Sequence, residues 1–253
     1  MIKQTINKFV AISLLLITLS ACEMFEIDNY EGPNATLTGG IIDAETGELV
    51  ETTLIEGSTL KLDEIGWAPG GTLTRVVKEN GEYQDDMMFA GKYKVTFSEC
   101  NFYPFVVDEI NVKKGENEIN FEVTPYLRII DPEIKLVGKE IIATFKLQGG
   151  KPEVKLSHIR VYHGRDMYAG EPYSLLSLAG PVFQNFDTPI EIDENQEFRL
   201  VVDLTNPWNK YLLRYKKNYY FRIGALASVP DVGTVRRNYA PYVVINFSAE
   251  ELN

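Results

Sequence analysis

The sequence predicts an all-β protein in which a cleaved N-terminal signal precedes two consecutive antiparallel β-sandwich domains. Short segments in which apolar and polar residues alternate recur along most of the chain, and this period of two is typical of strands with one buried face. Turn-forming pairs such as Asn80-Gly81 separate these segments at the spacing of a sandwich. Pro125 divides the strands into two sets, each large enough to bury a core.

Residues 1–21 have the layout of a secretory signal. Lys3 and Lys8 precede residues 9–19, which are apolar except for Ser13 and Thr18. A basic region, a short apolar run and small residues before the cleavage point are characteristic of such signals. The run is shorter than the roughly 20 apolar residues that a spanning helix needs, so it does not predict a transmembrane segment.

The segment Leu19-Ser20-Ala21-Cys22 follows the apolar run and resembles the bacterial lipobox. The resemblance implies that Cys22 is acylated, for example with palmitate, and becomes the first residue of the mature protein. It therefore predicts a protein that a lipid anchors in the outer membrane, facing the cell surface. The alternative is an ordinary secretory signal followed by a chance cysteine.

Residues 22–34 are expected to form an acidic tether after the lipidated cysteine. Glu23, Glu26, Asp28 and Glu31 are spread through it without a sustained period, and such a segment need not fold. Acidic residues close to a lipidated cysteine also resemble the surface-export signal of Bacteroidetes lipoproteins. The alternative is a plain acidic linker.

Residues 35–124 are predicted to form the first sandwich. Alternation and turn residues indicate strands around 37–41, 60–63, 73–77, 93–98, 105–112 and 119–123. Asn80-Gly81 is the strongest short hairpin signal, since both residues tolerate the left-handed region, so it predicts a hairpin. Ala90-Gly91 marks the next turn.

The first half resembles the transthyretin-like, carboxypeptidase-regulatory fold in three motifs. These are Gly40-Ile41-Ile42-Asp43 followed by Thr46-Gly47, then Asn80-Gly81-Glu82-Tyr83, and then Ala90-Gly91-Lys92-Tyr93-Lys94-Val95. Ala90 stands where that fold commonly has proline. The resemblance implies a structural or binding module and carries no catalytic residue with it.

Residues 125–253 are predicted to form the second sandwich. Strands are expected around 134–147, 154–163, 198–202, 219–225 and 242–247, and Gly138-Lys139 makes the first of these either a hairpin or one bent strand. The pattern Tyr219-x-Phe221-x-Ile223-x-Ala225 resembles the penultimate strand of fibronectin type III domains. An Ig-like or fibronectin III-like sandwich is therefore expected.

The lipobox and the two halves together resemble two-domain Bacteroidetes surface lipoproteins of uncharacterised function. Genes for such proteins commonly accompany starch-utilisation-type systems that import glycans. The resemblance implies an accessory role in glycan binding or in the assembly of a polysaccharide uptake complex, with outer-membrane importer components as partners. This expectation rests on an analogy of fold and context.

Charge and cysteine content exclude other classes. The chain has 25 basic and 36 acidic side chains, and its net charge of −11 repels phosphate backbones, so nucleic acid is not an expected partner. Cys100 is the only cysteine besides Cys22, and we expect it to be a small buried hydrophobe.

The sequence predicts a non-enzymatic protein without a metal or another cofactor. His158 and His163 are the only histidines, and five residues apart on one strand they face opposite sides. Adjacent carboxylates such as Asp85-Asp86 point apart, which suits a solvated surface better than the opposed pair of a glycosidase. A glycosidase or peptidase is the enzyme alternative.

Loop aromatics are the best candidates for a ligand site, because a ring stacks on the apolar face of a sugar while amides bond its hydroxyls. The candidate residues are Trp208 with Asn206 and Asn209, Trp67, Tyr168 and Tyr173. The alternative is that each tryptophan folds back onto its sandwich as part of the core.

The expected function is therefore glycan capture or complex assembly by a lipid-anchored protein. A structural spacer, or an adhesin or fimbria-associated subunit, is the main alternative. A glycan site is expected to use loop aromatics rather than charged residues, because neutral sugars offer hydroxyls and apolar faces but no charge.

Overall fold

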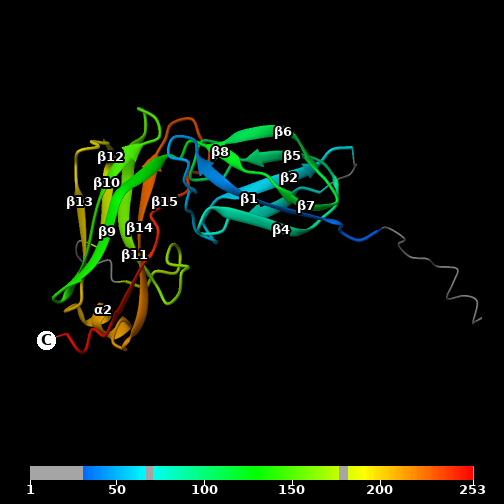
Figure 1. The fold of residues 1–253 in the computed structure, drawn as a ribbon. Helices are drawn as coiled ribbons and strands as arrows, with labels where there is room; N and C mark the ends of the chain where they lie inside the picture. The colour runs from blue at the N-terminus through cyan, green and yellow to red at the C-terminus, as the bar shows by residue number, and fades with distance from the viewer. Residues whose placement is uncertain (1–30, 67–70, 177–181, 253) are drawn as a thin grey trace, which may run out of the picture.

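The computed structural model describes residues 31–66, 71–176 and 182–252. The signal, Cys22 and Trp67 lie outside these ranges. The described chain is all β except for one short helix, and it forms two β bodies that meet at a bend (Figure 1). Each body has its own hydrophobic core. Within the described ranges, no helix combines the length and apolar character needed to cross a membrane.

The first body consists of two facing sheets. Its strands are β1 (Ala35–Asp43), β2 (Thr59–Glu64), β3 (Leu73–Val76), β4 (Glu82–Met88), β5 (Gly91–Phe97), β6 (Phe105–Val112), β7 (Gly115–Glu118) and β8 (Phe121–Val123). One sheet has the order β4-β1-β7 with β8 also paired to β1, and the other has the order β3-β2-β5-β6. The alternating apolar residues predicted for this half point inward, for example Leu37 and Ile41 from β1 and Val95 from β5. All six predicted strands of this half are confirmed, although β7 falls where a turn was expected.

The hairpin predicted at Asn80-Gly81 is wrong. The turn itself exists, with Gly81 at a φ of 86° and its amide donating to the carbonyl of Lys78. The strands on either side belong to different sheets, since β3 pairs with β2 and β4 pairs with β1. Turn chemistry allows the chain to reverse, but pairing depends on which sheet accepts the next strand. Val77 is completely buried where the chain leaves β3.

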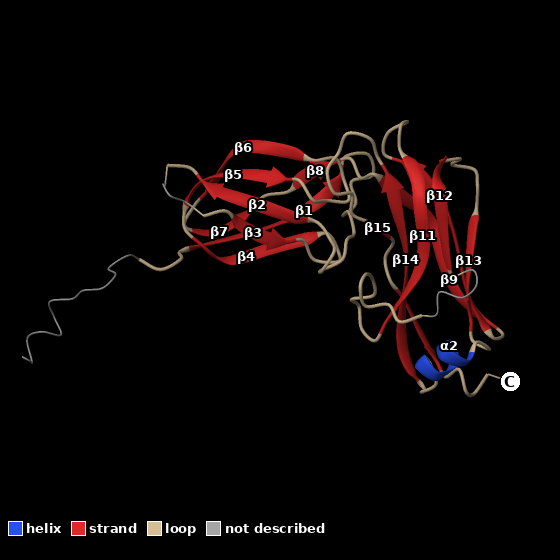
Figure 2. Cartoon of the chain, turned by 180° about the vertical axis from the view of Figure 1, so that it is seen from behind, coloured by secondary structure: helices blue, strands red, loops and turns tan. Residues whose placement is uncertain are grey.

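The second body also has two sheets. Its strands are β9 (Leu127–Val137), β10 (Glu140–Gly149), β11 (Lys155–Gly164), β12 (Phe183–Glu191), β13 (Phe198–Asp203), β14 (Lys217–Ser228), β15 (Asn238–Tyr239) and β16 (Val243–Phe247). One sheet has the order β13-β10-β9, and the other has the order β12-β11-β14, with β15 and β16 both paired to β14 (Figure 2). Of the two possibilities for Gly138-Lys139, the structure shows the hairpin, with Gly138 at a φ of 59°.

The only helix among the described residues is α2 (Pro207–Leu212). The sequence analysis expected Trp208 in a loop, and this prediction is wrong. Pro207 occupies the first turn, where its missing N–H costs nothing. The Asn206 side chain accepts hydrogen bonds from the backbone N–H groups of Trp208 and Asn209 and so caps the helix. These polar residues were read as turn residues because caps and turns use the same side chains.

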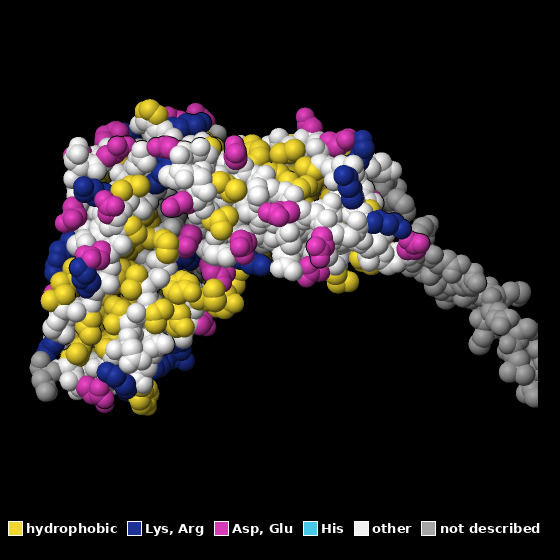
Figure 3. Space-filling model, viewed as in Figure 1, with side chains coloured by type: hydrophobic (Ala, Val, Ile, Leu, Met, Phe, Trp, Pro, Cys, Tyr) yellow, Lys and Arg dark blue, Asp and Glu magenta, His cyan; other side chains and the backbone are white. Residues whose placement is uncertain are grey.

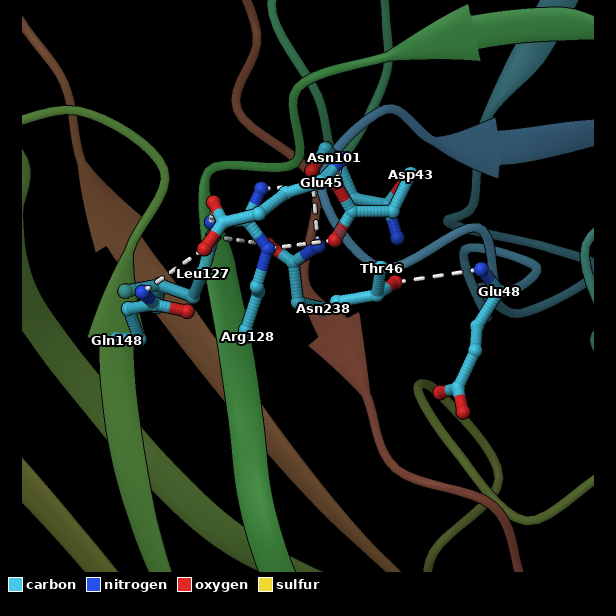
Figure 4. Close-up of polar contacts among 9 residues, drawn as sticks. All are labelled: Asp43, Glu45, Thr46, Glu48, Asn101, Leu127, Arg128, Gln148 and Asn238. Carbon is cyan, nitrogen blue, oxygen red and sulfur yellow. Dashed lines mark hydrogen bonds and ion pairs between the residues drawn. The ribbon is translucent and has the colours of Figure 1, made fainter.

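Buried arginines join the two bodies. Arg128 of β9 pairs with Asp43 at the end of β1 and with Glu45, with nitrogen–oxygen distances of 2.5 Å and 2.8 Å (Figure 4). Asn238 extends the contact by donating to the carbonyl of Asn101 at 2.8 Å.

Arg222 of β14 crosses the same junction more deeply. Its side chain is only 1% exposed. It forms an ion pair with Glu51 and donates to the carbonyl oxygens of Thr52 at 2.7 Å and Glu79 at 3.0 Å. These three acceptors belong to the first body, and the donor Arg222 belongs to the second. The junction is therefore a polar interface in which buried groups of one body find their hydrogen-bond partners in the other.

Candidate functional site

An apolar groove of about 470 Å³ lies at the inner side of the bend. We call it the elbow groove. Its lining residues are Thr53, Leu54, Ile55, His163, Gly164, Arg165, Asp166, Tyr168, Tyr173 and Leu175. The first three come from the loop between β1 and β2, and the others come from the end of β11 and the segment that follows it. Figure 3 shows hydrophobic side chains gathered on this side of the second body. Both bodies therefore contribute to the groove.

Glu171 holds the β11–β12 loop in place. Its carboxylate accepts from Arg160 at 2.9 Å and from the Tyr162 hydroxyl at 3.1 Å. Its backbone carbonyl accepts from the Thr53 hydroxyl at 3.3 Å, and its backbone N–H donates to the Tyr239 hydroxyl at 3.2 Å. The loop is thus fixed to both bodies, and a site built on it loses little conformational entropy when it binds a ligand.

The side chain of Trp208 connects helix α2 to this loop. Its indole Nε1 donates to the carbonyl oxygen of Leu175 at 2.7 Å, and Leu175 lines the elbow groove. The side chain is still 52% exposed. Of the two possibilities for this residue, a surface platform or a core plug, the structure shows the surface position.

Trp208 begins a row of planar side chains, which we call the aromatic row: Trp208, Tyr211, Arg214 and Tyr215. The rings of Trp208 and Tyr211 stack with their centroids 6.2 Å apart. The Arg214 guanidinium carbon lies 4.2 Å from the Tyr211 ring centroid and 4.5 Å from that of Tyr215. The three aromatic side chains are more than half exposed. The row offers several adjacent flat faces to a ligand.

The sequence analysis missed Tyr211, Arg214 and Tyr215, although a signal was present. From Trp208 to Tyr211 the step is three residues, which places these two rings on one face of a helix, and Tyr215 follows shortly after the end of α2. A loop was expected there, so helical spacing was not considered. Leu54, Ile55 and Leu175 were missed because no local pattern brings two distant loops together.

The structure brings some of the predicted residues together and separates others. Tyr168 and Tyr173 line the elbow groove, and Trp208 contacts the loop that carries them. Asn206 caps α2. Asn209 is 1% exposed, and its side-chain amide donates to the carbonyl of Asp203 at 3.0 Å. Of the predicted site residues within the described ranges, Tyr168, Tyr173 and Trp208 are therefore the ones that a ligand can reach.

The two histidines face opposite sides of β11, as predicted. His158 packs against Phe183, with ring centroids 4.4 Å apart, and burial and the nearby Arg237 lower its pKa to about 3. His163 packs against Tyr219 and Phe221. Both histidines are buried and neutral at physiological pH.

His163 is a buried residue whose backbone N–H donates to the Ser174 hydroxyl at 3.1 Å. Neither ring nitrogen has a hydrogen-bond partner among the described residues. Burial, with smaller contributions from Lys217 and Arg165, lowers its pKa to about 4. In the described ranges, no cluster of three or more His, Cys, Asp or Glu side chains is arranged to hold a metal ion.

The fold and the elbow groove together describe an all-β, sandwich-like protein with an exposed aromatic surface. Comparison with known proteins places it in a family. The family model described as "Protein of unknown function (DUF3823) N-terminal domain" matches residues 35–124. A solved protein from Bacteroides uniformis, described as a putative carbohydrate binding protein, is 42% identical, with a TM-score of 0.81, and the match covers 85% of this chain and 100% of that one.

The chain belongs to the DUF3823 family. Two solved members of that family share the fold at lower identity. One from Parabacteroides merdae is 22% identical with a TM-score of 0.68, over 85% of this chain and 100% of that one. Another from Bacteroides uniformis is 18% identical with a TM-score of 0.67, over 85% and 99%. No curated protein matches the chain.

Proposed function

We propose that this protein binds carbohydrate without transforming it, and that the aromatic row and the elbow groove form its binding surface. The observation that carries the proposal is the stacked, exposed pair of Trp208 and Tyr211 beside an apolar groove. Adjacent exposed rings suit the apolar faces of successive sugars. The description of the 42% identical relative as a putative carbohydrate binding protein supports the same assignment.

We further propose that the protein acts as an outer-membrane lipoprotein at the cell surface, anchored through Cys22. In this proposal it is an accessory component of a polysaccharide uptake system and contacts outer-membrane importer components. The lipobox-like segment Leu19-Ser20-Ala21-Cys22 supports the anchor. We also propose a transthyretin-like identity for the first body and an Ig-like or fibronectin III-like identity for the second. The two facing sheets of each body support these assignments, and their strands pair antiparallel except for β7 and β8, which run parallel to β1.

Replacing Trp208 tests the binding surface. Trp208→Ala should weaken binding of the mature protein to a retained polysaccharide by about 1–3 kcal/mol, the scale of one lost aromatic contact. The unfolding free energy should change by less than about 1 kcal/mol, because half of the side chain is already in water. Affinity electrophoresis over a polysaccharide panel and isothermal titration measure binding, and urea denaturation measures stability.

Phe89→Ala is the matched control, since Phe89 is 44% exposed on the first body. It should leave binding unchanged. If none of the polysaccharides slows the migration of the wild-type protein, the binding function is refuted. The structural spacer then remains as the alternative function. If Phe89→Ala weakens binding as much as Trp208→Ala does, the site lies elsewhere.

The anchor has its own test. Cys22→Ala removes the thiol that would carry the lipid, so we expect the protein to leave the membrane fraction and to incorporate no labelled palmitate. Cell fractionation and palmitate labelling of the full-length chain measure both effects. Cys100→Ala is the control and should keep the label. Equal labelling of wild type and Cys22→Ala would refute the lipobox assignment.

A further inference from the structure

The segment of the chain that carries the aromatic row is rich in basic residues, although the whole chain carries a net charge of −11. Residues 204–230 contain five basic residues and no acidic one. Four of the five lie within residues 207–217: Lys210, Arg214, Lys216 and Lys217. The surface that carries Trp208 is therefore locally positive on an acidic protein, and it attracts anions that the rest of the chain repels.

Arg214 is built into the row itself. Its guanidinium lies between the rings of Tyr211 and Tyr215, and its Nη2 donates to the Tyr215 hydroxyl at 2.7 Å. Among the described residues, no carboxylate pairs with it. A guanidinium has five N–H donors in a planar fork that matches a carboxylate or sulfate. Most of its donors thus remain for a ligand, held in one orientation by the two rings.

Three carboxylates of the second body near the aromatic row and the elbow groove have partners of their own. Glu251 lies 3.7 Å from the Lys216 ammonium. Asp203 accepts from the backbone N–H and the hydroxyl of Thr205, both at 2.7 Å. In the elbow groove, Asp166 accepts from the backbone N–H of Tyr168 at 3.0 Å. The cationic group of Arg214 therefore keeps its charge available for a ligand.

We propose that the carbohydrate bound at the aromatic row is an acidic glycan, whose uronate or sulfate groups pair with Arg214 while its rings stack on Trp208 and Tyr211. This inference rests on the proposed function and names its substrate class. It revises the expectation of a site without charged residues. Exposed rings with a guanidinium among them match a polymer that carries both apolar ring faces and anionic groups.

Binding of charged and uncharged forms of one polymer tests the proposal. We use the mature protein with oligogalacturonate, with its fully methyl-esterified form, with chondroitin sulfate and with neutral dextran. Inorganic polyphosphate of similar length serves as a polyanion that has no ring faces to stack on the aromatic row. The variant is Arg214→Gln. Lys94→Gln combined with Lys113→Gln is the control, since both lysines are exposed on the first body and the pair removes two positive charges where Arg214→Gln removes one.

We expect at least one acidic polysaccharide to bind, its uncharged counterpart to bind roughly tenfold more weakly, and binding to fall as salt is raised. Arg214→Gln should weaken acidic-glycan binding roughly tenfold, and the control pair should not. Neutral glycans that bind as well as acidic ones would overturn the inference and leave the proposed function intact. Polyphosphate binding as tight as glycan binding would overturn it in favour of a general polyanion surface. No binding of any polysaccharide would refute the proposed function as well.

Discussion

His163 shows how one residue makes stability depend on pH. Its pKa falls from an ordinary value of 6.5 to about 4 because it is buried beside Lys217 and Arg165. Below pH 6.5 the unfolded chain gains a proton that the folded chain does not bind. The stability that the neutral ring provides is therefore complete above about pH 6.5 and is lost as the pH falls towards about 4.

We predict that His163→Phe makes this part of the pH profile less steep, while His158, whose pKa is also lowered, keeps its own contribution to the slope. Phenylalanine keeps the ring packing against Tyr219 and Phe221 and removes the titrating group. The wild-type protein should lose up to roughly 1.4 kcal/mol of unfolding free energy per pH unit through this one proton, and the variant should lack that loss. Urea denaturation of both proteins across this range measures the difference. Parallel profiles would contradict the assignment of the loss to His163.

Cys100 behaves as the sequence predicted. It is 1% exposed, and burial raises the pKa of its thiol to about 12, so the reactive thiolate is scarce at neutral pH. Its backbone carbonyl accepts from Arg236 at 2.9 Å. The residue thus fills space at the junction of the two bodies.

At the scale of elements, helix α2 determines where the proposed binding surface lies. The helix is one short segment whose first turn depends on the Asn206 cap. Isolated helices of this length are not stable in water, so α2 depends on its cap and its packing. Leu213, at the end of the helix, is completely buried and fixes it to the second core. The positions of Trp208 and Tyr211 follow from these contacts.

We predict that Asn206→Ala lowers the unfolding free energy by about 1 kcal/mol, because two backbone N–H groups lose their acceptor. Glycan binding should weaken as well, since Trp208 would lose its fixed orientation. Asn206→Ser is the control, because a serine hydroxyl also caps well, and it should restore both properties. Stability restored by serine without recovery of binding would indicate that the Asn206 amide contacts the glycan directly. Urea denaturation and isothermal titration distinguish these outcomes.

At the scale of the whole molecule, Arg222 connects the two bodies through hydrogen bonds and an ion pair. Its guanidinium is buried, and its acceptors come from both bodies: Ala240 at 2.7 Å from the second, and Glu51, Thr52 and Glu79 from the first. Burial lowers the pKa of Arg222, and the nearby Glu51 opposes that shift. The elbow groove lies where the same β1–β2 loop meets the second body, so its shape depends on this junction.

We predict that Arg222→Met lowers the unfolding free energy by about 3–5 kcal/mol, because Glu51 and three carbonyl oxygens lose their donor while they stay buried. Arg199→Met is the matched control. Its ion pair with Glu140 spans 3.5 Å between half-exposed side chains and should contribute less than about 1 kcal/mol. Thermal and urea denaturation measure both variants. If both variants lose the same small amount of unfolding free energy, Arg222 at the junction contributes little to stability.

The sequence by itself determined the β class, the places of most strands and the burial of Cys100. Alternation along β1 and β5 correctly indicates which side chains enter the core, because the period of a strand is a local property. The exposed aromatics Tyr168, Tyr173 and Trp208 were also recognised as site candidates. Helix α2 and the remainder of the aromatic row were not, because capping residues resemble turn residues.

Only the tertiary structure decided which strands pair and which faces are covered. In β14, alternation assigns Phe221 and Ile223 to the core and would leave Arg222 in water, yet Arg222 is 1% exposed. The first body covers that second face of the strand, and residues more than a hundred positions away supply its partners. A local pattern reports that one face of a strand is apolar, but it cannot report what the rest of the chain places against the other face.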